Sequence, residues 1–240
     1  MKTFHALLRG KAKFYPAVTI NYARAAARDG YTLGRDRWNG GMVFQDLNYS
    51  QQYGTYFQYP YNLISAGVIL GPKQNNKILP MMTDKSQRPA DSHVLLDSGG
   101  YGFIDNPQNF HGQETRKKTL DFTLKYRPDG AMTLDIPPRK FSKYFPDYAA
   151  CRNTTLENLA YIVANCPEDQ LGIFLNVLQG EGESGDQIDD WYNSVKVHPF
   201  RNWAFAGTKY KRMPVLLGQL VKMRDDGALK YNMDTQPRGL

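Results

Sequence analysis

The sequence predicts an α/β protein with a parallel sheet, because short apolar runs alternate with segments of helical pattern. Each run is nearly continuous in apolar residues, as strands buried on both faces are. The runs are Val94–Tyr101, Ala131–Pro138, Leu171–Gly180 and Trp203–Gly207. The carboxyl ends of parallel strands meet at one edge of a sheet, where α/β proteins place their active sites. We therefore expect Asp97, Asp135, Gln179 and Gly207 to lie together at that edge.

The segments between these runs have the apolar spacing of amphipathic helices. The predicted helices cover 113–126, 154–165, 186–196 and 213–226. Thr154 is expected to cap the second of them, since Thr accepts hydrogen bonds from a first helical turn. Earlier in the chain, 21–28 reads as a helix and 62–70 as an apolar strand or buried segment.

Composition favours one globular domain over residues 1–240, with an irregular, Tyr- and Arg-rich region at 1–92. No apolar run is long enough to cross a membrane and no charged-then-apolar leader is present, so we expect no membrane contact and a cytoplasmic location. The net charge of +7 favours a polyanionic partner. Cys151 and Cys166 are the two cysteines, and a reducing compartment is the simpler expectation.

The first run contains a carboxylate, Asp97, which is followed directly by Ser98, Gly99, Gly100 and Tyr101. Glycines at such a strand end let the backbone approach a bound molecule closely. The same residues also make an ordinary strand-to-loop turn, since Asp, Ser and Gly are turn residues. The run alone does not separate these two interpretations.

The ordered set of strand ends resembles the tRNA-guanine transglycosylases and their DNA-acting relatives, the deazapurine DNA transglycosylases of bacterial modification clusters and viruses. The resemblance rests on Asp97-Ser98-Gly99-Gly100-Tyr101, on Asp135, on Leu178-Gln179-Gly180 and on Ala204-Phe205-Ala206-Gly207. It spans roughly 95–227. It implies a TIM-barrel-like (β/α) fold, and since a full barrel takes about 250 residues, we expect six or so units and a barrel that is incomplete or shortened at the C-terminus.

The resemblance also implies roles for these residues in replacing guanine by a 7-deazaguanine base of the preQ type. Asp97 becomes the general acid/base. Asp135 recognises guanine, because a carboxylate accepts parallel hydrogen bonds from N1–H and N2–H. Gln179, Gly180 and the backbone at Gly207 contact O6 and neighbouring polar atoms, and Ser98 and Gly99 position the site. Tyr101 stacks on a base that has left its helix.

Each of these residues has a structural interpretation as well. Asp135 precedes Ile-Pro-Pro and could simply end a strand and cap a turn. Gln179-Gly180 leads into an acidic, glycine-rich stretch typical of a surface loop. Tyr101 could be a core aromatic whose hydroxyl lies at the rim.

The C-terminal part departs from the family. The family's covalent mechanism needs a second aspartate as nucleophile, and no motif here matches it; Asp234 is the only acid after the last predicted helix. Without a second carboxylate, covalent glycosyl chemistry lacks its nucleophile. The cysteines do not form a Cys-x-x-Cys pair and have no nearby histidine, so we expect no metal and no cofactor.

The N-terminal third carries cations among aromatic rings, a mixture that suits phosphate contact with base stacking. The predicted nucleic-acid contacts are Arg24, Arg28, Arg35 and Arg37. The alternative is that the tyrosines here pack as an irregular layer over the sheet.

The leading functional hypothesis is guanine exchange on DNA by an enzyme whose nucleophile is unidentified. DNA is preferred because the chain lacks the zinc-bearing region typical of the tRNA enzymes. The same reaction on tRNA is the first alternative, and a non-catalytic base- or nucleic-acid-binding subunit is the second. An unrelated barrel enzyme acting on a small metabolite is a further alternative. An incomplete barrel leaves sheet edges exposed, and another subunit could cover them, so a homo- or hetero-oligomer is a further expectation.

Overall fold

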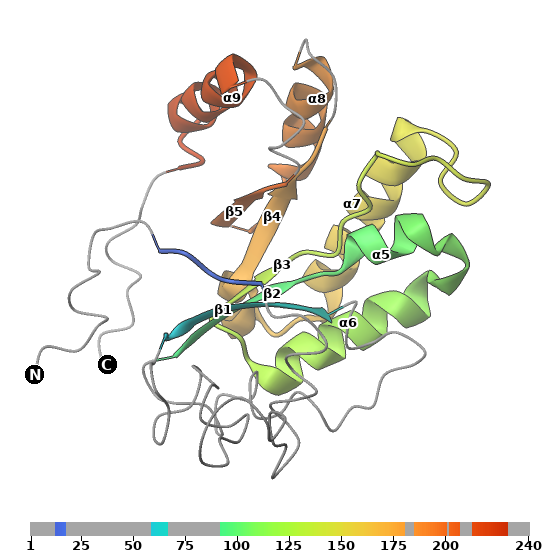
Figure 1. The fold of residues 1–240 in the computed structure, drawn as a ribbon, viewed down its shortest axis with the longest axis vertical. Coiled ribbons are helices and arrows are strands. Elements are labelled where there is room, and N and C mark those ends of the chain that lie inside the picture. The colour runs from blue at the N-terminus through green and yellow to red at the C-terminus, as the bar shows by residue number, and fades with distance from the viewer. Residues whose placement is uncertain are drawn as a thin grey trace, which may run out of the picture.

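The computed structural model describes residues 13–17, 59–66, 92–180, 185–200, 202–206 and 213–229. These residues form a parallel five-stranded sheet whose strands alternate with helices (Figure 1). The strands are β1 Tyr61–Ser65, β2 His93–Asp97, β3 Gly130–Met132, β4 Phe174–Leu178 and β5 Asn202–Phe205. The α/β class predicted from the sequence is therefore confirmed.

The spatial order of the strands is the same as their order in the chain, β1-β2-β3-β4-β5, and every pair is parallel. On the far side of β1, Ala17 forms an isolated parallel bridge to Leu63, and the Leu63 amide donates to the Pro16 carbonyl at 3.0 Å. The segment at Ala17 therefore pairs in parallel with β1 on the edge away from β2, and it also precedes β1 in the chain. Because parallel crossovers are right-handed, sequential order places successive helices on the same face of the sheet.

Four helices contribute to the main core on that face: α6 Gln113–Tyr126, α7 Tyr148–Asn165, α8 Asp186–Val195 and α9 Met213–Asp225. The short helix α5 Gly100–Asp105 packs through Ile104 in a separate small cluster. Short 3₁₀ turns lie at Pro107–Asn109 and Glu168–Ile173. Helix α6 packs against α7, and α7 against α8, which also contacts β4 (Figure 1). The ends of α6, α8 and α9 lie within one residue of their predicted positions.

The core lies between the sheet and these helices. Val94 and Leu96 of β2 are almost fully buried there, together with Leu159 of α7 and Trp191 of α8. Side chains alternate between the two faces of a strand, so Asp97 shares the opposite face of β2 with Leu95.

Two predicted strands are shorter than their apolar runs. Of the run 131–138, only 131–132 belong to strand β3; the Thr133 amide still donates to the Leu175 carbonyl at 3.0 Å, and 134–138 are outside any strand. The run 171–180 begins with a 3₁₀ turn, and its strand starts at Phe174. The predicted strand 62–70 is observed as Tyr61–Ser65, and 67–70 lie outside the described residues.

Helix α7 begins six residues before its predicted start at Thr154, so that prediction of the cap was wrong. Asp147 caps the helix instead, because its carboxylate accepts a hydrogen bond from the Ala150 amide at 2.7 Å. The segment Tyr148–Asn153 lacks the regular apolar spacing that marked the rest of the helix. The sequence pattern therefore located only the later turns of α7.

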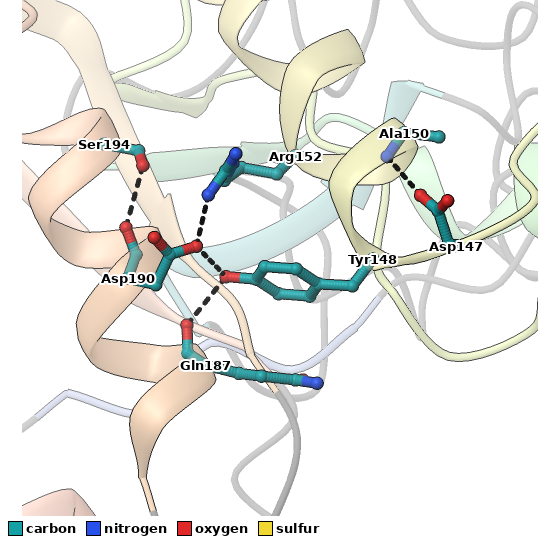
Figure 2. Close-up of polar contacts among 7 residues, drawn as sticks. All are labelled: Asp147, Tyr148, Ala150, Arg152, Gln187, Asp190 and Ser194. Atoms are coloured by element: carbon teal, nitrogen blue, oxygen red, sulfur yellow. Dashed lines mark hydrogen bonds and ion pairs between the residues drawn. The ribbon is translucent and has the colours of Figure 1, made fainter.

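A polar cluster joins the first turns of α7 to α8 (Figure 2). The Tyr148 hydroxyl lies 2.8 Å from the Gln187 carbonyl and 2.9 Å from Oδ2 of Asp190. Arg152 donates to the same carboxylate oxygen at 2.5 Å, and the Ser194 hydroxyl donates to the Asp190 carbonyl at 2.8 Å. These contacts fix α8 beside α7, and α8 in turn packs on β4, the strand that precedes Gln179.

The described helices include none that is both long and apolar enough to cross a membrane. The predicted helix 21–28 lies outside the described residues. Among the N-terminal tyrosines that are described, Tyr61 is fully buried in β1 and packs edge-on against Tyr15 and Tyr59. Tyr61 is therefore part of the sheet itself, and the irregular layer expected of the N-terminal tyrosines lies mostly outside the described residues.

Candidate functional site

Asp97 is the last residue of β2 and is half-buried at the carboxyl end of the sheet. Its neighbour across the ladder is Ser65, the last residue of β1. Within the described part of the chain, no hydrogen bond or ion pair engages its carboxylate. Asp97 thus presents an uncommitted acid at the edge where α/β proteins bind their ligands.

Asp135 lies beside Asp97, three residues beyond the end of β3, and only 5% of it is exposed. The Ser98 hydroxyl donates to Oδ1 of Asp135 at 3.0 Å. The side-chain amide of Gln179, directly after β4, donates to Oδ2 at 2.5 Å. Residues from three separate strand ends therefore converge on one carboxylate, as expected from the meeting of parallel strand ends.

The surroundings of Asp135 raise its pKa to about 6. Burial is the largest cause, since it penalises the charged form, and the nearby negative charge of Asp97 raises the pKa further. The hydrogen bonds from Gln179 and Ser98 act in the opposite direction because they stabilise the carboxylate. Asp135 therefore titrates close to neutral pH.

The backbone on both sides of Asp135 is held by side chains of α7. The Leu134 carbonyl accepts a hydrogen bond from the Asn158 amide at 2.9 Å, and the Ile136 amide donates to the Thr155 hydroxyl at 2.9 Å. These bonds replace the strand ladder, which has ended at Met132. The segment that carries Asp135 is therefore fixed without being part of a strand.

Arg116 of α6 extends this support, because its Nε donates to Oδ1 of Asn158 at 2.7 Å. Sequence reasoning did not identify Thr155, Asn158 or Arg116. The available signal was the placement of Thr155 and Asn158, three positions apart, on the same helical face as the core residues Leu159 and Ile162. Polar side chains at core positions are generally hydrogen-bonded to a specific partner.

The glycines of the site bring the chain close to itself. A Cβ atom on Gly100 would lie 1.8 Å from the Asp135 carbonyl oxygen, and one on Gly180 would lie 2.6 Å from the Ile188 amide nitrogen. Gly99 has a φ of +75°, which favours glycine, and precedes α5. Gly100 therefore sets the distance between α5 and Asp135, and Gly180 sets that between β4 and α8.

Tyr101 lies in the first turn of α5 and is 55% exposed. The sequence did not predict this helix, which is short and begins at Gly100, directly after Gly99. The exposed ring rules out the interpretation of Tyr101 as a core aromatic. Its hydroxyl and ring are accessible beside the strand ends.

Several predicted site residues lie outside the described residues. They are Gly207 and the four N-terminal arginines, Arg24, Arg28, Arg35 and Arg37, and the C-terminal Asp234 is outside as well. The acidic stretch 181–184, directly after Gly180, is also not described.

No group of three or more His, Cys, Asp and Glu side chains in the described ranges is arranged to hold a metal ion. Cys151 lies within α7 and Cys166 follows it, and both are free, buried thiols. Burial raises the pKa of both thiols, which keeps them protonated at neutral pH.

Comparison with known proteins adds no assignment: neither the protein-family models nor the curated protein sequences gave a match to this chain. The interpretation of the site therefore depends on its residues and their geometry.

Proposed function

We propose that this chain binds a purine base beside Asp97 and Asp135 and exchanges guanine in DNA for a 7-deazaguanine base. The observation that carries the proposal is the pair itself: a half-buried Asp97 whose carboxylate has no hydrogen bond or ion pair to another described residue, next to a buried Asp135 that Ser98 and Gln179 hold in place. Two carboxyl groups whose environments differ this much can take separate roles in acid/base chemistry.

Asp135 is suited to recognise the base. A carboxylate accepts about four hydrogen bonds, and Ser98, Gln179 and the backbone amide of Asp135 itself supply three. One acceptor position remains for a donor such as N1–H or N2–H of guanine. A donor at this position would stabilise the charged form of a carboxylate that burial otherwise disfavours.

Asp97 is suited to move the proton. When guanine leaves the sugar, its N9 gains a proton as the glycosidic bond breaks, and the incoming base loses a proton from N9 as the new bond forms. One carboxyl group can give the first proton and accept the second, so the exchange consumes no net proton. The nucleophile that holds the sugar in between is not assigned to a described residue.

We infer that the sheet is part of a (β/α) barrel. Sequential parallel strands with helices on one face support this, because a doubly wound sheet reverses its strand order and places helices on both faces. A barrel opens its active site at the carboxyl ends of the strands, where Asp97 and Asp135 lie. We place the reaction in the cytoplasm, of a bacterium or of a virus-infected cell.

The test is to incubate the full chain with radiolabelled guanine and either DNA or tRNA, and to measure the label retained in the polymer. The proposal predicts label in DNA, and its release when unlabelled 7-deazaguanine base is added. Label in tRNA alone would assign the reaction to tRNA. A chain that binds guanine but labels neither polymer would be a binding subunit, and the exchange proposal would be wrong.

A further inference from the structure

The loop of residues 139–145, which follows Asp135 by four positions, exposes two aromatic rings. Phe141 is 52% exposed and Tyr144 is 47% exposed. The two exposed rings lie three positions apart in one short loop.

This 139–145 loop is fixed in shape. The Ser142 amide donates to the Phe145 carbonyl at 2.9 Å, and the Ser142 hydroxyl accepts from the amides of Tyr144 and Phe145 at 3.3 Å each. Phe145 is 2% exposed and packs in a small core against Phe110, with the two ring centres 5.6 Å apart. A loop anchored in this way presents Phe141 and Tyr144 with little entropy left to lose on binding.

Lysines alternate with these rings. Lys143 places its ammonium group 5.2 Å from the centre of the Tyr144 ring, and Lys140 forms an exposed ion pair with Asp105 at 3.3 Å. The other acid close in sequence is Asp147, whose carboxylate accepts from the Ala150 amide at the start of α7. Flat rings interleaved with cations are the side chains that bind single-stranded nucleic acids.

The 139–145 loop also borders the candidate site. Asp105, the partner of Lys140, ends α5, and Tyr101 lies one helical turn earlier on the same side of that helix. Helix α5 begins directly after Asp97, Ser98 and Gly99. Helix α5 therefore connects the strand end at Asp97 to the loop, and it carries the exposed Tyr101 in its first turn.

We propose that the 139–145 loop binds a single strand of nucleic acid, with phosphates on Lys140 and Lys143 and unpaired bases stacked on Phe141 and Tyr144. The inference rests on the proposed function, since it supplies the surface that holds the strand from which a nucleotide reaches Asp97. A single strand fits because a base inside a duplex does not offer its face to a side chain. The Lys140–Asp105 pair must open for Lys140 to reach a phosphate.

The test measures binding of the full chain to a fluorescent single-stranded oligonucleotide by anisotropy, without any free base. The aromatic pair Phe141→Ala with Tyr144→Ala should weaken binding at least about tenfold, with the same dependence on salt. The lysine pair Lys140→Ala with Lys143→Ala should reduce the slope of log affinity against log salt by about 1.4, since each phosphate contact on a single strand contributes about 0.7. Asp105→Asn should tighten binding, because it frees Lys140.

Matched controls separate the loop from general effects of exposed residues. Leu217→Ala with Val221→Ala removes exposed apolar side chains of α9, and Lys117→Ala with Lys118→Ala removes exposed lysines of α6. Neither control should change binding of the oligonucleotide. Circular dichroism confirms that each variant is folded.

The inference is wrong if the loop variants bind the oligonucleotide as the unmodified chain does, or if the chain binds only duplex. It is also wrong if the aromatic variant changes self-association or vesicle binding and leaves oligonucleotide affinity unchanged. Because binding is measured without exchange, the two proposals fail separately. If the unmodified chain exchanges guanine but the loop variants bind the oligonucleotide normally, only the proposal for the loop is wrong. If the loop variants bind the oligonucleotide less tightly but the unmodified chain does not exchange guanine, only the proposed function is wrong.

Discussion

The side-chain amide of Gln179 donates a hydrogen bond to Oδ2 of Asp135 at 2.5 Å, across the ends of two neighbouring segments of the sheet. Gln179 directly follows β4, whereas Asp135 lies beyond β3. The bond fixes the orientation of a buried carboxylate and stabilises its charged form.

Gln179→Leu should raise the pKa of Asp135 above about 6, because the hydrogen bond from Gln179 lowers it and burial remains. The measurement is a titration of the Asp135 carboxyl carbon by NMR, assigned with Asp135→Asn. Gln113→Leu, at the exposed start of α6, is the control and should leave the titration unchanged. A midpoint that stays the same or falls in Gln179→Leu contradicts the contact.

Asp135 should make the chain less stable as the pH rises from about 4 to about 6. Its pKa is raised from 3.8 to about 6, so the folded chain binds the proton more tightly than the unfolded chain. Stability is therefore highest below the unfolded pKa and declines up to the folded one, by at most about 3 kcal/mol.

Urea unfolding of Asp135→Asn and of the unmodified chain between these pH values measures that decline. As the pH rises, the free energy of unfolding of Asp135→Asn should increase relative to that of the unmodified chain. Asp121→Asn, which changes an exposed acid of α6, should show no such shift relative to the unmodified chain. A pH-independent difference for Asp135→Asn would mean that the buried carboxyl does not titrate as described.

Thr155→Val should lower the free energy of unfolding by about 1–3 kcal/mol, because it leaves the buried Ile136 amide without an acceptor. Thr155→Ser keeps the hydroxyl and should lose less. Chemical denaturation of both variants gives the comparison. If Thr155→Val is as stable as the unmodified chain while Thr155→Ser is less stable, the methyl group, and not the hydrogen bond beside Asp135, is what stabilises the chain.

Gly100→Ala and Gly102→Ala form a matched pair within α5. A Cβ on Gly100 meets the Asp135 carbonyl oxygen at 1.8 Å, whereas one on Gly102 meets nothing within 4 Å. Gly100→Ala should cost about 1–3 kcal/mol of stability or more, because backbone has to move. Gly102→Ala should be neutral or stabilise the helix by up to about 1 kcal/mol. Thermal unfolding measures both, and equal stabilities would contradict the close approach.

The sequence was a good guide to the helices and to the meeting of the strand ends. Helix α6 covers Gln113–Tyr126 as predicted, since its apolar spacing begins and ends within those residues. Asp97, Asp135 and Gln179 come together because they lie at or just beyond the ends of neighbouring parallel strands. The alternation of strands and helices in the sequence predicts a parallel sheet, and therefore predicts this meeting of strand ends.

The supports of Asp135 could not be read from the sequence in the same way. The run 131–138 looks like one strand, yet beyond Met132 its backbone bonds to Thr155 and Asn158 of α7. Such partners depend on how α7 sits on the sheet, and no local pattern encodes that. The short helix α5 was missed for a related reason: it contains two glycines and follows two more residues of turn type.

The most direct test of the account is the rate at which Asp97→Asn incorporates labelled guanine into DNA, compared with the unmodified chain and with Asp121→Asn. We predict a loss of at least about a hundredfold for Asp97→Asn, with DNA affinity unchanged, since the substitution removes a proton-transferring group and no phosphate contact. Asp121→Asn should retain the full rate. A folded Asp97→Asn chain that exchanges guanine as fast as the unmodified chain would contradict the central role of Asp97.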